Sequence, residues 1–381
     1  GTTTITAEDT TGYAWDVNGT DSFDNNDGGV TFDLGSGVDS HIRTGQADGA
    51  NSFHHLTILL NSSSNTLHLR PNAGTAMTIE GNLTVQEGKF YKYNDNYVLT
   101  VTGHVNVESG GELGLSSASV AYNFGSLTVA GTYIATSATT VITGETGSGR
   151  AVDIVGTYTD NGGILEIQTP ADTLLRWPSS SDVNHLKINH ASCIARPTGD
   201  NSPVIAGNLL VTAGEFNTLE GGQNHALTVT GEVIISSGAT LTCNASVVSM
   251  NALTNEGTFV ASSGTTTILV DIRNRTGATF THNGGTVAIT TGATYFIHNT
   301  GSYSTITFHN LTYTGANCYL VKSINVEGTF SNTSGYIRLT SNAKITLGTT
   351  TSQGTFALGA NKFYPYGPWY LYGASELFPG I

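Results

Sequence analysis

The chain has 381 residues, of which 47 are glycine and only 11% are charged, and its net charge is −14. Thr, Ser, Val and Ile are abundant while helix-forming Lys, Glu, Met and Gln are scarce, which is typical of strands and turns. The acidic balance disfavours nucleic acid as a partner, because phosphate contacts need clustered Lys and Arg. No apolar run reaches the roughly 20 residues that cross a bilayer, so we expect no membrane span.

The first 48 residues are acidic and rich in Asp and Asn. Two short runs, 16–21 and 24–28, contain the carboxylate and amide oxygens that calcium prefers. They lack the spacing of an EF-hand loop, and Asx-rich turns bond equally well to their own backbone. We therefore expect turns here and no cofactor. The alternative is a calcium site formed by four carboxylates: Asp16, Asp21, Asp24 and Asp27.

A motif of one apolar residue, two His or Asn residues and Leu occurs three times, at 53–56, 183–186 and 308–311. Its leucines are 130 and 125 residues apart (186 − 56; 311 − 186). A Gly-Gly pair precedes each copy, and segments like Gly-Asn-Leu and Leu-Thr-Val-Thr-Gly follow it. We interpret this order as three super-repeats, at roughly 1–138, 139–264 and 265–362. The chain starts inside the first copy, from which we expect that a segment precedes it.

Inside each super-repeat, Gly-x-apolar markers recur every 20–28 residues, for example at positions 81, 103, 131 and 156. This spacing is the length of one solenoid coil. Each coil contains short alternating strands, such as 83–85 and 233–235, which place Val, Leu and Ile inside and Thr or Ser outside. The sequence therefore predicts an all-β fold, a single elongated parallel β-helix over residues 1–362. We expect about 16–18 coils, with about six in each super-repeat.

The histidines at 54 and 55 look at first like metal ligands, but the repeat offers another interpretation. The two positions before the motif leucine are His or Asn in all three copies: His54 and His55, Asn184 and His185, His309 and Asn310. Both side-chain types can bond to backbone groups at a tight corner. We expect a structural role for these residues and no metal site.

Polysaccharide-cleaving β-helices need carboxylates that converge on one outward face. Beyond residue 50, Asp and Glu are sparse. Glu80 and Glu327 occupy equivalent positions in different super-repeats, too far apart to act as a pair, and Glu108, Glu112 and Glu145 have no evident partner. We therefore expect no catalytic residue and no enzyme activity.

Residues 363–381 differ from the rest, because they contain seven of the 33 aromatic residues and three prolines. The open end of a solenoid needs to be covered. We predict a C-terminal cap or docking tail, with a carbohydrate-stacking patch as the alternative. The residues predicted for this role are Phe363, Tyr364, Tyr366, Trp369, Tyr370, Tyr372 and Phe378.

The segments 51–58 (NSFHHLTI), 81–85 (GNLTV) and 99–103 (LTVTG) resemble the repeats of large β-solenoid proteins. Such repeats occur in virion structural proteins of tailed phages, especially capsid-decorating and fibre proteins, and in secreted bacterial adhesins. The resemblance implies a structural, non-catalytic protein at a virion surface or in the extracellular space. It also implies a homo-oligomer or a subunit docked on a capsid or other surface protein, with a glycan as a further partner. The alternatives are a bacterial cell-surface adhesin or extracellular filament module and, second, a tailspike-type polysaccharide depolymerase.

Overall fold

The structure, a computed structural model, describes residues 1–17, 25–35, 37, 39–44, 52–70, 76–92, 97–115, 120–178, 183–199, 202–290, 295–297, 303–315, 318–320, 322–334, 336–339, 343–348, 355–357, 362–364, 370–371 and 376–378. These residues form a parallel β-solenoid of about 12 turns and contain no helix. The predicted all-β parallel β-helix is confirmed. Accordingly, no described residue belongs to a helix long and apolar enough to cross a membrane. The chain divides into two units, Gly1–Leu186 and Lys187–Ile381.

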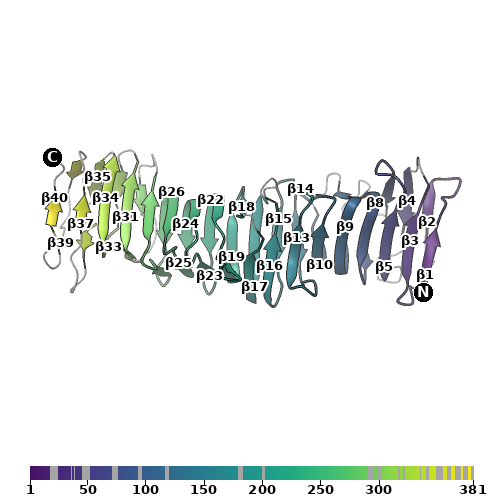
Figure 1. Ribbon diagram of the computed structural model, residues 1–381, viewed down its shortest axis with the longest axis horizontal. Helices are drawn as coiled ribbons and strands as arrows, with labels where there is room; N and C mark the ends of the chain where they lie inside the picture. Colours follow the sequence, from purple (N-terminus) through teal and green to yellow (C-terminus); the bar gives the residue numbers. More distant parts are fainter. Residues whose placement is uncertain are drawn as a thin grey trace. The chain divides into compact units, whose positions relative to one another are not determined.

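In unit 1 the strands stack in three columns, and each strand pairs in parallel with the strand one turn before and one turn after it (Figure 1). The first column holds β1 (Thr2–Ile5), β3 (Gly29–Asp33), β5 (His55–Leu59), β8 (Leu83–Lys92), β9 (Leu99–Leu115), β10 (Tyr122–Val129), β13 (Arg150–Ile154) and β16 (Asp172–Arg176). The second holds β2 (Tyr13–Asp16), β4 (Asp39–Arg43), β6 (Thr66–Leu69), the ends of β8 and β9, β11 (Thr132–Ile134) and β14 (Thr157–Thr159). The third holds β7 (Met77–Ile79), the starts of β9 and β10, β12 (Thr139–Ile142) and β15 (Ile164–Ile167).

Unit 2 repeats this arrangement, and β17 (His185–Pro197) contains the boundary between the units. Its first column holds β19 (Leu209–Asn217), β22 (Leu227–Ile235), β24 (Val248–Asn255), β26 (Thr265–Asn274), β29 (Tyr295–Ile297), β32 (Cys318–Leu320), β35 (Tyr336–Leu339) and β38 (Lys362–Tyr364). The second holds β18 (Val204–Ile205), the starts of β22, β24 and β26, and then β28 (Thr286–Ile289), β31 (Asn310–Thr314), β34 (Thr329–Ser334), β37 (Thr355–Ala357) and β40 (Glu376–Phe378).

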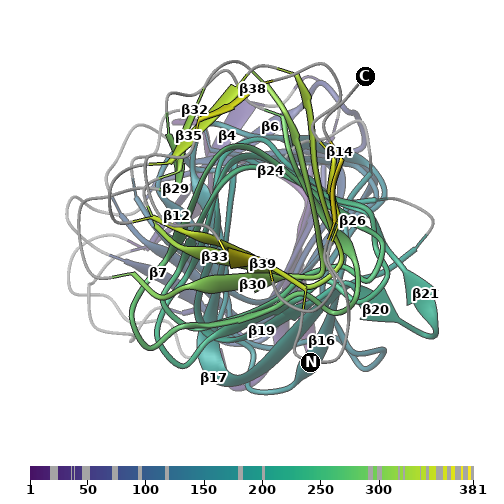
Figure 2. The same ribbon diagram turned by 90° about the vertical axis from the view of Figure 1, so that its left-hand side faces the viewer.

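The third column of unit 2 holds the end of β19, β23 (Thr240–Thr242), β25 (Thr258–Val260) and β27 (Thr279–Thr281), followed by a separate ladder of β30 (Ile306–Phe308), β33 (Ile324–Val326), β36 (Ile345–Leu347) and β39 (Tyr370–Leu371). Figure 2 shows β30, β33 and β39 on one side of the coil and β32, β35 and β38 on another. A small antiparallel pair, β20 (Leu219–Glu220) with β21 (Gln223–Asn224), projects from this unit.

The core consists of inward apolar residues that stack on their counterparts one turn away. Alternation along each strand sends every second side chain inside, and the register places Val30 against Leu56 and Leu56 against Leu83. The three motif leucines, Leu56, Leu186 and Leu311, are fully buried, as predicted. Burial of one such side chain stabilises the fold by about 1.5–3 kcal/mol.

The described residues form about 12 turns, so the 16–18 coils expected for the whole chain are not reached. One reason is coil length. The first register steps, Thr2 to Gly29, Gly29 to His55 and Leu56 to Leu83, span 27, 26 and 27 residues (29 − 2; 55 − 29; 83 − 56), the long end of the expected spacing. The other reason is that part of the chain lies outside the described residues.

The super-repeat in unit 1 is close to the expected length of about six coils but falls short of six whole turns. From Val30 to Val152 the first column advances by five register steps. In the first copy Gly28 O accepts the N–H of His55, and in the second copy Gly163 O accepts the N–H of His185. Gly163 is therefore the counterpart of Gly28, and Leu165, two residues later, is the counterpart of Val30. Leu165 lies in the third column. A super-repeat is therefore not a whole number of turns, because loop lengths, which the spacing of glycines does not specify, determine where each copy starts.

Candidate functional site: two polar corners

A hydrogen-bonded ladder runs along a corner of unit 1, at the position just before each inward apolar residue. His55 Nδ1 accepts the backbone N–H of Asn82 at 2.9 Å, and Asn82 Oδ1 accepts that of His104 at 2.9 Å. His55, Asn82 and His104 precede the buried Leu56, Leu83 and Val105, which stack in register. His55 and Asn82 therefore each satisfy a backbone donor one turn further along.

Bonds of the same kind occur in unit 2, one in the first column, between β19 and β22, and one in the second column, between β31 and β34. Asn208 Oδ1 accepts the N–H of Glu232, and Asn310 Oδ1 accepts the N–H of Thr329, both at 2.9 Å. We call these two series of residues the corner ladder. The prediction that His and Asn before the motif leucine bond to backbone is thus confirmed for His55 and Asn310.

The corner ladder explains why glycine precedes Asn in the Gly-Asn-Leu segments and recurs one turn later. A Cβ on Gly103 would lie 2.4 Å from Asn82 Oδ1, and one on Gly231 would lie 2.3 Å from Asn208 Oδ1. Both distances are shorter than van der Waals contact. The glycine is required because both the Asn side chain and a glycine carbonyl oxygen of the preceding turn lie over it.

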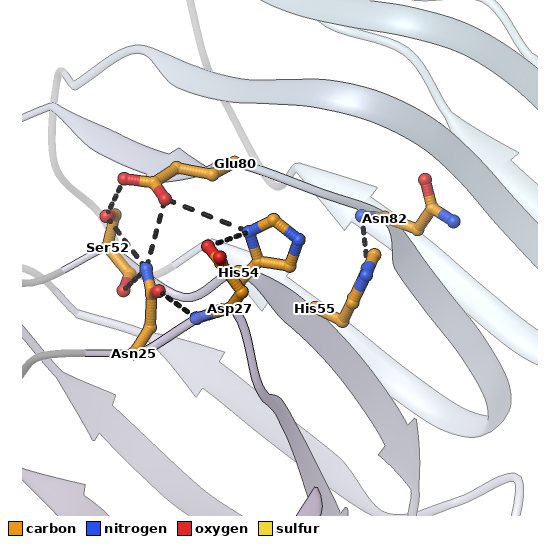
Figure 3. Close-up of polar contacts among 7 residues, drawn as sticks. All are labelled: Asn25, Asp27, Ser52, His54, His55, Glu80 and Asn82. Atoms are coloured by element: carbon orange, nitrogen blue, oxygen red, sulfur yellow. Dashed lines mark hydrogen bonds and ion pairs between the residues drawn. The ribbon is translucent and has the colours of Figure 1, made fainter. Parts of the chain in front are cut away.

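The first corner cluster consists of Asn25, Asp27, Ser52, His54 and Glu80 (Figure 3). It begins at a tight turn in which Asn26 and Asp27 have positive φ angles of 43° and 55°, as the central residues of a type I′ turn do. Asn25 Oδ1 accepts the N–H of Asp27 at 3.0 Å, which holds the turn closed. Asn tolerates this geometry better than most residues.

Glu80 joins the three successive turns of this cluster. Its carboxylate accepts hydrogen bonds from the hydroxyl of Ser52 and, at 3.1 Å, from Nδ2 of Asn25. These two bonds, from Ser52 first and then Asn25, stabilise the charged form and lower the pKa of Glu80 below its usual value. Glu80 is therefore an ionised acceptor at neutral pH.

His54 lies between two carboxylates (Figure 3). Its Nδ1 is 3.6 Å from Asp27 Oδ1 and 3.9 Å from Glu80 Oε2. The contacts of the His54 ring nitrogen are therefore with side chains, whereas those of the His55 ring include a backbone N–H. The rings of His54 and His55 lie next to each other, with centroids 4.4 Å apart, and His55 is the one whose Nδ1 accepts the next backbone N–H.

The second corner cluster consists of His282, His309 and Glu327 in unit 2. Its turn has the same form, because Gly285 N–H bonds to His282 O as Gly28 N–H bonds to Asn25 O. His282 Nδ1 accepts the N–H of Gly284 at 3.0 Å, which is the bond that Asn25 makes in unit 1. His282 is thus the counterpart of Asn25.

The remaining members of the two clusters correspond as well. His282 Nε2 lies 3.2 Å from Glu327 Oε2, where Asn25 Nδ2 bonds to Glu80. His309 stacks on His282 with ring centroids 5.6 Å apart and planes 27° apart. The predicted equivalence of Glu80 and Glu327 is therefore visible in their contacts.

The first corner cluster contains one pair of carboxylates that could support acid–base chemistry. Asp27 and Glu80 both lie within 4 Å of one nitrogen of His54, hence within about 10 Å of each other, the spacing range of glycosidase pairs. Such a pair also needs a general acid whose pKa is raised. The pKa of Glu80 shifts in the opposite direction, and the side chain of Asp27 is 88% exposed.

A second arrangement in unit 1 resembles a hydrolase pair, because His104 Nδ1 and Ser126 Oγ are 2.8 Å apart. A serine nucleophile has to be reachable by its substrate. Ser126 is only 3% exposed, and burial lowers the pKa of His104. Ser126 precedes the buried Leu127, so this contact is the next step of the corner ladder. The two residues are 22 positions apart, and only the register brings them together.

Two of the four acidic residues considered for calcium, Asp16 and Asp27, have different partners in the structure. Asp16 forms an ion pair with Arg43 at 3.5 Å, and Arg43 also packs over the ring of Tyr13 at 4.2 Å. Asp27 belongs to the first corner cluster. The other two candidates for calcium, Asp21 and Asp24, lie outside the described residues.

The backbone of the aromatic C-terminal segment adds strands to the columns of unit 2. Four of the predicted docking residues lie in β38, β39 and β40: Phe363, Tyr364, Tyr370 and Phe378. Three others lie outside the described residues: Tyr366, Trp369 and Tyr372. The described part of this segment therefore pairs in parallel with the preceding turn.

Several charged contacts that the sequence did not indicate join successive turns. Glu112 lies 3.6 Å from Lys89 Nζ and accepts a hydrogen bond from Tyr91, although it has no partner recognisable in the sequence. Asp153 pairs with Arg150 at 3.3 Å and with Arg176 at 2.5 Å. Glu112 follows Tyr91 by 21 residues, and Arg176 follows Asp153 by 23 residues, which is about one coil in each case. This spacing is the sequence signal that could have indicated these pairs.

The fold and the repeated corners define a parallel β-solenoid repeat protein. No protein-family model, no curated protein and no solved structure matches this chain.

Proposed function

We propose that this chain is a structural, non-catalytic surface protein, a phage capsid decoration or fibre subunit that projects from the virion. One observation supports this most. The side chains that most resemble catalytic or metal-binding groups in unit 1, His54, His55 and Glu80, make contacts between successive turns. The same corner recurs in unit 2 with other residue types, as expected for residues that hold the coil together.

The partner in this proposal is a further copy of the chain, a capsid protein or another surface protein. The aromatic side chains in residues 363–381 combine a large apolar area with polar groups, which suits a docking surface. A bacterial cell-surface adhesin or extracellular filament module is the alternative, because the resemblance of the repeats extends to both classes. Either role places the protein at a virion surface or outside the cell.

A tailspike-type depolymerase is the second alternative, and the proximity of Asp27 and Glu80 favours it. Two observations disfavour a depolymerase: the pKa of Glu80 is lowered, and the second corner cluster lacks the carboxylate pair. The counterpart of Asp27 there is Gly284, so the carboxylate pair is not repeated whereas the Glu that joins the turns is.

The proposal is tested by removal of residues 363–381. We expect the shortened chain to keep its β signal in circular dichroism and to lose oligomer formation and attachment, measured by light scattering and by immunogold electron microscopy of the source particles and cells. Normal oligomers and normal particle labelling without these residues would contradict the docking role. Label on cell envelopes instead of particles would favour the adhesin.

The depolymerase alternative has its own readout. Reducing ends released from capsular polysaccharide by the intact protein, and not by Glu80→Gln, would replace the structural proposal with an enzyme. Glu145→Gln, which changes an exposed carboxyl outside the cluster, is the control for this assay.

A further inference from the structure

We propose that His282, His309 and Glu327, the second corner cluster, bind a divalent transition-metal ion such as Zn²⁺. Each residue offers one ligand atom, and these three atoms lie within 4.8 Å of one another. Two imidazoles and one carboxylate are a ligand set that zinc takes in open sites, with water as the fourth ligand. All three residues are partly exposed, so an ion and its water can reach them.

The distances need little adjustment. Ligands at about 2.0–2.1 Å from a tetrahedral zinc ion are about 3.4 Å apart. His282 Nε2 and Glu327 Oε2 already lie 3.2 Å apart. Small rotations of the His309 side chain cover the remaining difference.

The backbone of each ligand is held by hydrogen bonds at its own corner. His282 O accepts the N–H of Gly285, His309 O accepts that of Gly328, and Glu327 N–H bonds to Phe308 O. The ligands come from three successive turns that are fixed before the metal arrives, which reduces the ordering cost of binding.

One contact has to change when the metal binds. His282 Nδ1 accepts the N–H of Gly284, so the neutral ring carries its proton on Nε2, toward Glu327. Coordination through Nε2 moves that proton to Nδ1, and the exposed Gly284 N–H bonds to water instead. The exchange of one exposed hydrogen bond costs less than a metal–imidazole bond contributes.

The first corner cluster has the same turn but lacks the second imidazole that the proposed zinc site uses. Asn25 closes the turn and bonds to Glu80 as His282 does to Glu327, but its amide offers no imidazole nitrogen. The substitution His282→Asn therefore reproduces a corner that already exists in this protein, with its turn and its bond to the carboxylate. It removes a ligand with little risk to the fold.

The test is a titration of the full-length chain, without a histidine tag and freed of metal by a chelator, with Zn²⁺ by calorimetry and with Co²⁺ by visible absorption. We expect one equivalent of Zn²⁺, a Co²⁺ spectrum typical of four-coordination, and a rise in Tm with added zinc. His282→Asn and Glu327→Gln should each weaken binding at least about tenfold. Their circular dichroism should stay that of the wild type.

His190→Asn is the matched control. His190 Nδ1 accepts the N–H of Ser192 at 3.2 Å, the same turn contact that His282 makes, but His190 is not part of the three-ligand cluster. It should bind zinc as the wild type does. Zinc binding that is absent in the wild type, unchanged in His282→Asn, or equally weakened in His190→Asn would overturn the proposal.

Discussion

The two corner clusters are copies of one structure with different chemical content. In unit 1 the turn residue is Asn25, and its amide group bonds to both Asp27 N–H and Glu80. In unit 2 the turn residue is His282, and its ring makes the equivalent contacts to Gly284 N–H and Glu327. The comparison shows that the corner needs an acceptor and a donor at fixed positions, and that two residue types satisfy this need.

The two clusters differ in the side chains that surround these shared bonds. The first has a second carboxylate, Asp27, which lies beside His54, and a hydroxyl, Ser52, which donates a hydrogen bond to the ionised Glu80. In the second, Gly284 stands in place of Asp27, and Thr307, the counterpart of Ser52, bonds to Asn325 instead. Its second imidazole is His282, on which His309, the counterpart of His54, is stacked. The same backbone thus carries a structural corner in one unit and a metal-binding corner, as proposed, in the other.

The largest expected effect concerns the buried leucine beside each corner. Leu56→Asp and Leu311→Asp each place a charge where the native side chain is fully buried, which should cost several kcal/mol. Thermal unfolding followed by circular dichroism should show a large fall in Tm for both. The outward neighbours Thr57→Asp and Thr312→Asp should change stability by no more than about 0.5 kcal/mol. Equal effects at inward and outward positions would refute the register.

The next largest effect concerns the glycine at each corner, where a Cβ is opposed by different groups in unit 1 and in unit 2. A Cβ on Gly81 would lie 2.5 Å from the His55 ring and 2.7 Å from the carbonyl oxygen of His54, so a flexible side chain and rigid backbone both oppose it. Gly81→Ala should cost about 1–3 kcal/mol. Because the backbone contact remains, His55→Ala should not restore the Tm.

In unit 2 the opposition comes mainly from a side chain. A Cβ on Gly328 would lie 2.5 Å from Asn310 Oδ1 but 3.2 Å from the carbonyl oxygen of His309. Asn310→Ala loses one hydrogen bond, about 1 kcal/mol, and should relieve Gly328→Ala. A double-mutant cycle from denaturant unfolding should then show a combined loss smaller than the sum. Additive losses would mean that the side chain does not oppose the Cβ.

The smallest effect is a dependence on pH at the first corner. The folded pKa of Glu80 is lowered, so its hydrogen bonds to Ser52 and Asn25 contribute stability above the unfolded pKa of about 4.3. This contribution is lost as pH falls through the lower folded value. Because Glu80 is 45% exposed, it amounts to about 1 kcal/mol or less.

The measurement is the Tm of the wild type and of Glu80→Gln from pH 7 down to pH 2. The difference between the two should be largest near neutral pH and should disappear at the acidic end. Glu145→Gln is the control and should follow the wild type throughout. A constant difference at every pH would show that the stabilisation does not depend on the charge of Glu80.

Much of the coil could be read from local patterns. Alternation in segments such as 83–85 predicted which side chains point inward, and Leu56, Leu186 and Leu311 are buried accordingly. The repeated His or Asn before these leucines predicted a backbone contact, which His55 and Asn310 make. These features depend on a residue and its immediate neighbours, so they appear in every copy.

The corner clusters could not be read in this way. Asn25 and Glu80 meet across 55 residues, and His282 and Glu327 across 45 (80 − 25; 327 − 282), because two turns separate them. Register steps vary from 18 to 28 residues along unit 1 (140 − 122; 41 − 13), so spacing alone does not say which side chains come together. The carboxylate pair at Asp27 and Glu80 was missed for the same reason.

The sequence by itself determined the strand-and-turn character of this protein, the inward residues and the residue types required at each corner. These follow from backbone geometry over a few residues, where alternation and hydrogen-bonding capacity act locally. The tertiary structure decided which corners of successive turns face one another, and so placed His282 beside His309 and Glu327. That choice depends on the lengths of loops between strands, which change the register without changing the local pattern.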